Sequence, residues 1–442
     1  MRKIIFIFSL FLIFSCKDDD DNVVVPEKII TGYMYTSTNA NGQNAVLGFA
    51  QYQDGSLAEL DNSPFFTKDL GASEQGDFDA QYSIRIIDDL LLVVNAGRNP
   101  SNGTISVFRI DKPSGNLTLI DQTPNELASY NINSRGIRPV TLDVKTINGK
   151  TWVIVGNQHS QVGYIGEDEE LSGPIIDSNE RNITLFSLEL ETGMLTFETV
   201  LDTYFDGNLG GVSSVNFNQN GDKFTVTTMG IYHALINYPN PSLIKPAQTY
   251  FYNFNNGSAT ENGVFMEEGV AGTVAAIWSP SESKVYTVSF NVIEDKIDYD
   301  VVSINTSDYS LSQHFRSGLE LDNSSCWLAF SEDKRDLFAV NLGENTIASY
   351  RVGANDNLEI IANPYITRTT GLEGRELKDI ISQNGFVYAV SAVNSHKISI
   401  FQLNGDGSLT ELSYSPFPIP SARNFTEEDA IFLGLVGYTL ID

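Results

Sequence analysis

Short apolar runs alternate with polar turns from residue 29 to the end of the chain. The segment "LLLVVNAGRNPSNGTISVFRIDKPSGNLTLIDQTP" (90–124) shows the unit: an apolar strand, a polar turn, an alternating strand that ends in Phe-Arg-Ile, a glycine turn and another short strand. Alternating apolar and polar residues between turns rich in Gly, Asn, Asp and Ser are typical of antiparallel β-strands. The pattern therefore predicts an all-β protein made of successive hairpins.

The same unit returns along the chain. It recurs as "LFAVNLGENTIASYRVGANDNLEIIANPY" (337–365) and as "VYAVSAVNSHKISIFQLNGDGSLTELSYSPF" (387–417), and each copy follows one more apolar strand and a turn. Weaker copies fill the remaining length, which gives seven repeats, of which the first has only three strands. Repeats of four short strands are typical of the blades of a β-propeller.

A ring of blades has to close, because an open edge strand exposes unpaired amides and carbonyls. The tail "DAIFLGLVGYTLID" (429–442) is an apolar run that follows the last blade. We expect it to supply the missing inner strand of the first blade; a peripheral position outside the ring is the alternative. The sequence thus predicts one domain, residues 29–442, that forms a seven-bladed β-propeller of four-stranded antiparallel blades closed by the C-terminal strand.

The N-terminal segment, residues 1–15, has the features of a secretory signal. Arg2 and Lys3 precede an apolar run, which is shorter than the roughly 20 residues that span a membrane. Cys16 comes next, and the run Ile-Phe-Ser-Cys resembles the lipobox of bacterial lipoproteins. The resemblance implies cleavage before Cys16 and attachment of diacylglycerol to its thiol; an ordinary signal peptide with a chance cysteine is the alternative.

Four aspartates follow Cys16 and Lys17. This run resembles the acidic export tag with which some gram-negative bacteria carry lipoproteins to the outer face of the outer membrane. We therefore expect residues 16–28 to be a lipidated acidic tether that holds the protein on the outer membrane, facing the cell exterior.

The charge of the chain limits its partners. The formal net charge is −29, from 27 basic and 56 acidic residues. Such a surface repels nucleic acid and anionic membranes, so we expect no nucleic-acid partner and a membrane contact only through the lipid anchor. The acidic insertion at 164–180 is a candidate contact with a surface protein, a glycan or a cation.

Metal, cofactor and disulfide chemistry have no pattern in the sequence. No EF-hand or H-E-x-x-H spacing occurs, so we expect no metal site and no cofactor. Cys326 has no partner for an intramolecular disulfide once Cys16 is lipidated, and we expect it to be a buried apolar residue.

Two stretches carry a family resemblance. The segments "NAGRNPSNGTISVFRIDKPSGNLTLI" (95–120) and "CWLAFSEDKRDLFAVNLGENTIASYRVGANDNLEII" (326–361) resemble blades of the lactonase family of seven-bladed propellers, which includes bacterial 6-phosphogluconolactonase and fungal carboxymuconate-lactonizing enzyme. The likeness extends over nearly the whole mature chain. The shared blade pattern is structural, because its Gly and Asn residues form turns and its Ile and Phe residues pack between blades.

The resemblance also implies where the chemistry of such an enzyme would lie. Family enzymes carry a P-H-A-H-S type run before the inner strand of a middle blade and an Arg-His pair before the next one. This chain has Gly210, Gly211, Val212 and Ser213 at the first place, and Gly272, Thr273 and Val274 at the second. Activity therefore has to be argued from other residues.

The remaining candidates are arginines, acids and one histidine near the ends of inner strands. An anionic ligand of so acidic a protein requires a local concentration of arginine. Arg135 and Arg138 precede the expected inner strand of the third repeat, Arg375 precedes that of the last, and Arg85 lies within that of the second. We expect the loops that enter the inner strands to meet at one mouth of the channel, with these ligand-binding candidates: Arg135, Arg138, Arg375, Glu373, Glu376 and His159. The alternative is that each arginine pairs with a nearby carboxylate and joins adjacent blades.

Two functions fit these observations. The first is a non-catalytic, surface-anchored propeller that binds a partner or serves as a scaffold. The second is a lactone hydrolase, similar to 6-phosphogluconolactonase, that acts on a sugar-acid lactone. The missing histidines favour the first. Of the four histidines in the chain, we expect His396 to lie solvated in a hairpin turn.

Overall fold

The computed structural model describes most of the chain from residue 28 onward. The described residues are 28–71, 80–97, 101–126, 129–158, 164–165, 171–172, 181–204, 211–230, 232–233, 245–289, 294–319, 323–361, 364–421 and 431–440. The acidic insertion and His159 therefore lie wholly or largely outside the described residues.

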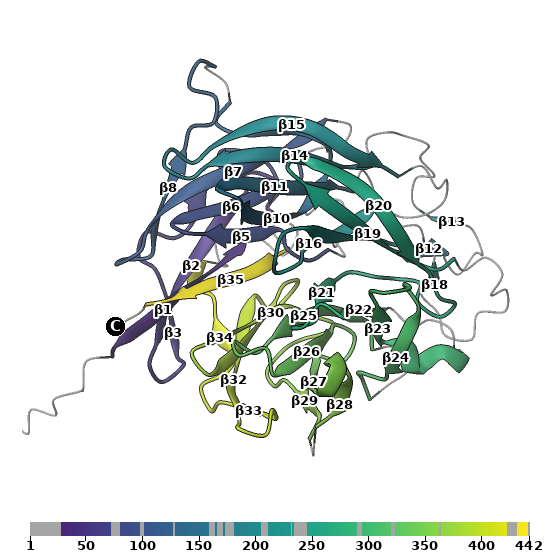
Figure 1. The fold of residues 1–442 in the computed structure, drawn as a ribbon. Coiled ribbons are helices and arrows are strands. Elements are labelled where there is room, and N and C mark those ends of the chain that lie inside the picture. Colours follow the sequence, from purple (N-terminus) through teal and green to yellow (C-terminus); the bar gives the residue numbers. More distant parts are fainter. Residues whose placement is uncertain are drawn as a thin grey trace, which may run out of the picture.

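Seven antiparallel sheets form the blades of a propeller, and Figure 1 shows them following one another around a ring. In blades 1 to 7 the inner strands are β35 (Leu433–Thr439), β5 (Ile84–Ile87), β10 (Pro139–Ile147), β16 (Val212–Phe217), β21 (Ala276–Trp278), β25 (Ser325–Phe330) and β30 (Leu377–Gln383). The second strands are β1 (Ile30–Ser37), β6 (Leu90–Asn95), β11 (Lys150–Asn157), β17 (Lys223–Thr228), β22 (Lys284–Val288), β26 (Asp336–Asn341) and β31 (Phe386–Ser391).

The outer half of each blade follows the same order. The third strands are β2 (Ala45–Tyr52), β7 (Asn102–Asp111), β14 (Asn182–Glu189), β19 (Gln248–Asn255), β23 (Val301–Asn305), β27 (Thr346–Val352) and β32 (Lys397–Leu403). The outer strands are β3 (Leu57–Glu59) with β4 (Phe65–Phe66), β8 (Asn116–Ile120) with β9 (Ile132–Ile137), β15 (Met194–Thr203), β20 (Ser258–Phe265), β24 (Leu311–Phe315), β28 (Leu358–Ile360) with β29 (Ile366–Arg368), and β33 (Leu409–Glu411) with β34 (Phe417–Pro418).

A few elements lie outside the blades. A small sheet joins β12 (Tyr164–Ile165), β13 (Leu171–Ser172) and β18 (Tyr232–His233). Two short 3-10 helices span Glu294–Tyr299 and Ala354–Asp356. No helix among the described residues is long and apolar enough to cross a membrane.

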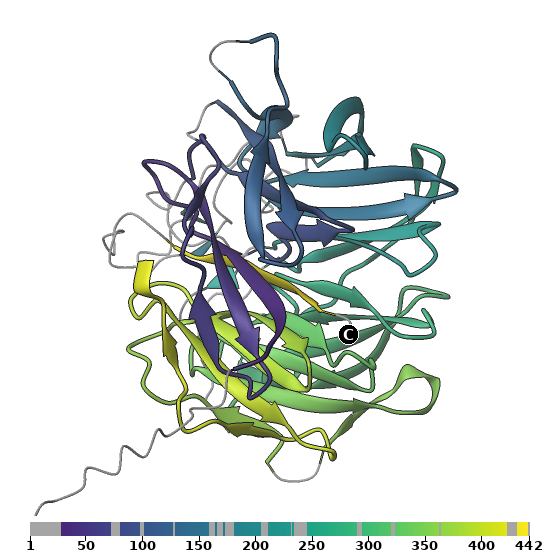
Figure 2. The ribbon, with the colours of Figure 1, turned by 90° about the vertical axis from the view of Figure 1, so that its left-hand side faces the viewer.

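The C-terminal strand closes the ring, as predicted. β35 pairs antiparallel with β1, with Tyr33 opposite Tyr438. The hydroxyl of Thr36 donates a buried 2.6 Å hydrogen bond to the carbonyl of Gly434. Figure 2 shows β35, in yellow, beside the purple strands of blade 1. The seven-bladed architecture and its closure are both confirmed.

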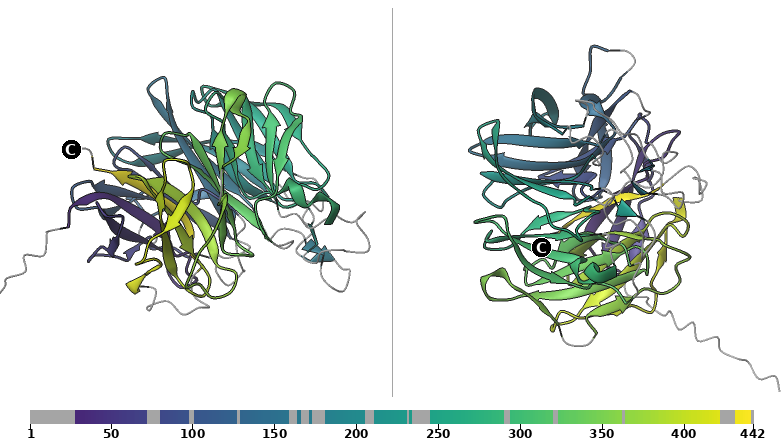
Figure 3. Two further views of the ribbon diagram at one scale, coloured as in Figure 1. Left: turned by 90° about the horizontal axis from the view of Figure 1, so that it is seen from below. Right: turned by 90° about the vertical axis from the view of Figure 1, so that its right-hand side faces the viewer.

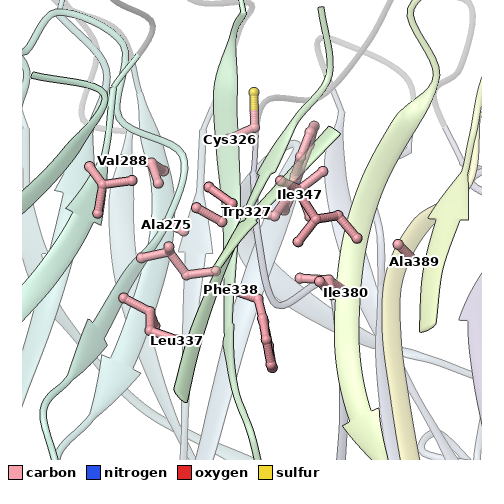
Figure 4. Close-up of a cluster of buried hydrophobic side chains, with 14 of the residues drawn as sticks. Ala275, Val288, Cys326, Trp327, Leu337, Phe338, Ile347, Ile380 and Ala389 are labelled. Atoms are coloured by element: carbon pink, nitrogen blue, oxygen red, sulfur yellow. The ribbon is translucent and has the colours of Figure 1, made fainter. Parts of the chain in front are cut away.

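Apolar side chains fill the spaces between neighbouring blades. The largest core cluster joins blades 5, 6 and 7, with Val288, Trp327 and Ala389 among its members (Figure 4). Cys326 lies in the same cluster, fully buried, as predicted. Close contact between faces of adjacent sheets removes most apolar area from water and stabilises the ring.

Tyrosines on the second strands of blades 1, 5 and 7 also link these blades to a turn of the next one. Tyr35 donates to the carbonyl of Gly115 at 2.7 Å, and Tyr388 donates to that of Gly55 at 2.9 Å. The ring contributes buried apolar area, and the hydroxyl fixes the register between two blades.

Candidate functional site

The seven inner strands surround a central channel. Each inner strand contacts the inner strands of both neighbouring blades, so the channel wall is continuous. Figure 3 shows the ring from two further directions. We call the end at which the inner strands begin the entry end, and the end at which they finish the exit end.

The channel is reached from the exit end. In β25 the first four residues are buried, whereas Ala329 and Phe330 are partly exposed. In β30 the first four residues are likewise buried, and Ile381 and Ser382 after them are partly exposed. Solvent therefore reaches the finishing halves of these strands and is excluded from their starting halves.

The segment Ala80–Ser83, which leads into β5, closes the entry end; we call it the plug. Gln81 crosses the channel: its side-chain amide donates to the carbonyl of Leu328 at 2.7 Å and to Asp379 Oδ1 at 3.0 Å. Its backbone amide donates to the carbonyl of Ser213 at 3.1 Å. One residue of blade 2 thus binds blades 4, 6 and 7.

Residues on both sides of Gln81 strengthen this closure. The indole of Trp327 donates to the carbonyl of Ala80 at 3.0 Å. The carbonyl of Tyr82 accepts a 2.8 Å hydrogen bond from the amide of Leu142, in blade 3. All four plug residues are buried, so the plug is part of the core and not a surface loop.

A cavity of about 250 Å³ lies against the plug, toward the exit end. Six of the seven blades line it. The lining residues are Gln81, Tyr82, Arg85, Asn216, Ile277, Leu328, Ala329, Phe330, Asp379, Ile380, Ile381, Ser382 and Leu435.

An ion pair lies at this cavity. Arg85 Nε is 3.1 Å from Asp143 Oδ1, and the two side chains are 21% and 12% exposed. The Arg85 guanidinium also lies over the ring of Tyr82, 3.6 Å from its centre. Asp143 Oδ2 accepts from the backbone amide of Phe217 at 2.7 Å. The pair is thereby fixed in position, with the arginine facing the cavity.

Two further charged residues are buried in β30, and one of them, Asp379, lines the cavity. Burial raises the pKa of Asp379 to about 6, although its hydrogen bonds from the Ile380 amide and from Gln81 oppose this shift. Burial lowers the pKa of Lys378 to about 7, and the charge of Asp379 opposes this change. Strongly shifted pKa values in a cavity are typical of functional sites, although structural charge networks also produce them.

The sequence-based candidates lie elsewhere. Arg135 belongs to β9, which pairs with β7 as an outer strand of blade 2, so it does not lie in a loop directly before an inner strand. It is exposed, and its guanidinium lies 5.0 Å from the ring centre of Phe197, in blade 3. Arg138 does precede β10 directly, but it is only 2% exposed.

The candidates of blade 7 have structural contacts. Arg375 is exposed at the entry end and donates to the hydroxyl of Ser324 at 2.5 Å. The buried carboxylate of Glu376 accepts hydrogen bonds from the backbone amides of Val393 and Asn394, and so holds the turn between β31 and β32. Glu373 is exposed. Whether any of these residues binds a ligand remains a prediction.

The two places at which the family resemblance puts histidine and arginine are filled by small buried side chains. Val212, Ser213, Thr273 and Val274 are all fully buried, and Ser213 donates to the carbonyl of Thr273 at 2.5 Å. A Cβ atom on Gly211 would lie 2.0 Å from the carbonyl oxygen of Gln158, so no side chain fits there.

The expectation for His396 is wrong. Its side chain is only 6% exposed, and its ring lies 4.6 Å from that of Phe432, between β31–β32 and the chain leading into β35. The turn position was correct, but the chain leading into β35 covers it.

Sequence reasoning found Arg85 on an inner strand but missed its partners. Asp143 and Asp379 are charged residues inside largely apolar stretches of the inner strands, "VTLDV" and "LKDII". Such residues require a buried partner, which was the available signal. Among the described residues, no three His, Cys, Asp or Glu side chains are grouped as metal ligands.

Comparison with known proteins gives a fold and no sequence family. No protein-family model matches the chain, and no curated protein sequence matches it. Among solved structures, a putative 6-phosphogluconolactonase from Bacteroides fragilis aligns with a TM-score of 0.61 at 16% identity, over 92% of this chain and 98% of that one.

Two further structures align over similar lengths. A putative 6-phosphogluconolactonase from Bacteroides uniformis gives a TM-score of 0.61 at 17% identity, over 93% of this chain and 100% of that one. The periplasmic gluconolactonase of Pseudomonas aeruginosa gives 0.58 at 15% identity, over 94% and 100%. At such low identity a shared fold does not imply a shared activity. The chain therefore has the seven-bladed propeller fold of the lactonase-like proteins.

Proposed function

We propose that this protein is a non-catalytic binding propeller, anchored on the outer face of the outer membrane through a lipidated Cys16. The observation that carries the proposal is the plug, Ala80–Ser83. It fills the entry end of the channel, where the family resemblance places the chemistry of the lactonases, and its hydrogen bonds to four other blades hold it there.

The residues around the plug support the same conclusion. The positions of the family's histidines and arginine hold Gly211, Val212, Ser213, Thr273 and Val274, which are buried and include neither a cationic side chain to bind a carboxylate nor an imidazole to transfer a proton. A lactone would have to displace part of the core to reach them.

A lactone hydrolase is the second candidate, and one observation favours it. Arg85, Asp143 and Asp379 come together at the exit-end cavity, and an arginine beside carboxylates is a plausible site for acid-base chemistry. Solved structures with this fold include proteins named as lactonases.

A hydrolysis assay separates the two functions. The purified protein is tested with 6-phosphogluconolactone and simple sugar lactones, beside the variants Arg85→Gln and Ser399→Ala. Ser399 is buried in the same propeller but does not line the cavity, so Ser399→Ala is the matched control. We expect no hydrolysis above the uncatalysed rate. Hydrolysis that Arg85→Gln abolishes and Ser399→Ala retains would overturn the proposal.

The anchor has its own test. We expect the protein to fractionate with outer membranes and to be cut by protease added to intact cells. Cys16→Ser should release it from the membrane fraction, because stable attachment depends on the acyl chains. A Cys16→Ser protein that stays in the membrane would contradict a lipid anchor at this residue.

A further inference from the structure

We infer that the exit-end cavity binds a neutral sugar ring, either a free monosaccharide or the terminal unit of a glycan. This inference rests on the proposed binding function and names its ligand class and its site.

Three blades direct polar groups to the cavity. Arg85 pairs with Asp143 through Nε, lines the cavity and keeps 21% of its side chain exposed. Asp379 of blade 7 also lines the cavity, whereas the hydroxyl of Ser382, in the same strand, is hidden from solvent. Asn216 lines the same cavity; its backbone carbonyl accepts from the Trp278 indole, and its side-chain amide can bind a ligand. Donors and acceptors from separate blades suit a molecule that carries hydroxyl groups around a ring.

The charges favour a neutral ligand. Arg85 and Asp143 compensate each other, so the site does not attract a full charge of either sign. An anion would enter a protein of net charge −29 and approach Asp379 as well. A cation would meet the half-buried guanidinium of Arg85. A hydroxylated ring without charge avoids both penalties and can accept from Arg85 while it donates to carboxylate or amide oxygens.

The rest of the wall is apolar. Ile277, Leu328, Ile381 and Leu435 line the cavity, with the partly exposed ring of Phe330. Sugar rings have one face of C–H groups, which can lie against an aromatic or aliphatic side chain while the hydroxyls bind polar groups. Small-molecule sites generally combine such a wall with a few convergent polar groups.

The size and shape of the cavity limit the ligand to about one ring. Its volume of about 250 Å³ is at the small end for ligand sites in proteins, which begin at roughly 300 Å³. Gln81 and Tyr82 close its inner end, so a chain cannot pass through the channel. A longer glycan would therefore insert its end and leave the remainder outside the exit end.

Intrinsic tryptophan fluorescence provides a direct test. Two of the three tryptophans report on this region: Trp278 donates to the backbone of Asn216, and Trp327 donates to the plug. The purified protein is titrated with neutral hexoses, with N-acetylated hexosamines, with oligosaccharides that end in them, and with the corresponding sugar acids. We expect saturation with at least one neutral sugar at a Kd on the order of 1 mM, as small ligands with few contacts allow.

Variants of one residue locate the site. Ser382→Leu fills the cavity without touching the ion pair and should abolish saturation. Ser382→Ala removes a hydroxyl that is hidden from solvent and leaves the cavity open, so it should bind as the wild type does. Ser399→Ala deletes another buried hydroxyl of blade 7 that has no partner in the described part of the chain, and it should bind as the wild type does. Since Arg85→Gln leaves Asp143 unpaired and can impair folding, the Ser382 variants decide the matter.

Each outcome has a definite meaning. Saturation by an oligosaccharide but not by its free terminal sugar would identify the end of a glycan as the ligand. The inference is overturned if no neutral sugar saturates, if Ser382→Leu binds as the wild type does, or if sugar acids bind more tightly than neutral sugars. Lactone hydrolysis would overturn the proposed function instead, whereas a protein that neither hydrolyses lactones nor binds sugars would keep its proposed function and lose this ligand.

Discussion

Arg351 Nε lies 2.5 Å from Asp336 Oδ1, between two strands of blade 6, and the arginine's terminal nitrogen donates to the carbonyl of Asp406 in blade 7. Arg109 repeats this arrangement in blade 2: it contacts Asp89 at 2.8 Å and donates to the carbonyl of Glu191 in blade 3. The arginine of the repeated Phe/Tyr-Arg pattern therefore joins one blade to a turn of the next.

The two arginine contacts should differ in strength because their aspartates differ in burial. Asp336 is fully buried, whereas the Asp89 side chain is 42% exposed. We expect Arg351→Gln to lower the free energy of unfolding by about 2 kcal/mol, as for a charged hydrogen bond to a buried group. Arg109→Gln should cost less than about 1 kcal/mol. Urea unfolding of both variants checks this; equal losses would show that burial does not decide the difference.

Tyr388 should contribute to closure of the ring. Its hydroxyl accepts from Gln51 at 2.8 Å and donates to the carbonyl of Gly55, both in blade 1. Tyr388→Phe leaves the Gly55 carbonyl without this donor and the Gln51 amide without one of its two acceptors, at a cost of about 1–3 kcal/mol. Tyr414→Phe is the control, because Tyr414 donates to the neighbouring carbonyl of Asp54 but is 43% exposed. A thermal unfolding midpoint that falls equally in both variants would refute a special role for Tyr388.

Deletion of residues 429–442 should abolish cooperative folding. The deletion removes β35, the inner strand of blade 1, and exposes the paired edge of β1. We expect rapid cleavage of this variant by a nonspecific protease and loss of a single unfolding transition. Deletion of residues 441–442 alone is the control. A truncated protein that unfolds with the wild-type midpoint would contradict the closure.

Lys378 should make stability depend on pH above neutrality. Its folded pKa of about 7 is below the unfolded value of 10.5, so the unfolded chain binds more protons between these values and stability rises with pH across this window. Lys378→Met removes this contribution. The free energy of unfolding of the wild type, relative to Lys378→Met, should therefore increase from pH 7 to pH 10; a constant difference would show that the buried amine does not titrate as described.

The repeated hairpins were predictable because their signals are local. Alternation and turn residues within about ten positions specify each pair of strands, and the unpaired first blade required a closing strand. The exit-end cavity was not predictable, since Gln81 and Asp379 are 298 residues apart and meet only when the ring is complete. His396 shows the same limit: its turn was visible in the sequence, but the chain before β35 that covers it was not.

Closure by β35 also determines which end of the propeller lies next to the N-terminal tether. The amide of Leu440, just after β35 ends, donates to the carbonyl of Thr31, so β1 begins at the exit end. Lys28, the first described residue, contacts Asp54 there. A tether that precedes Lys28 would pull on this end of the molecule. The exit end would then lie nearest the anchor, and the opposite end, where β11 and β17 finish, would point away from it.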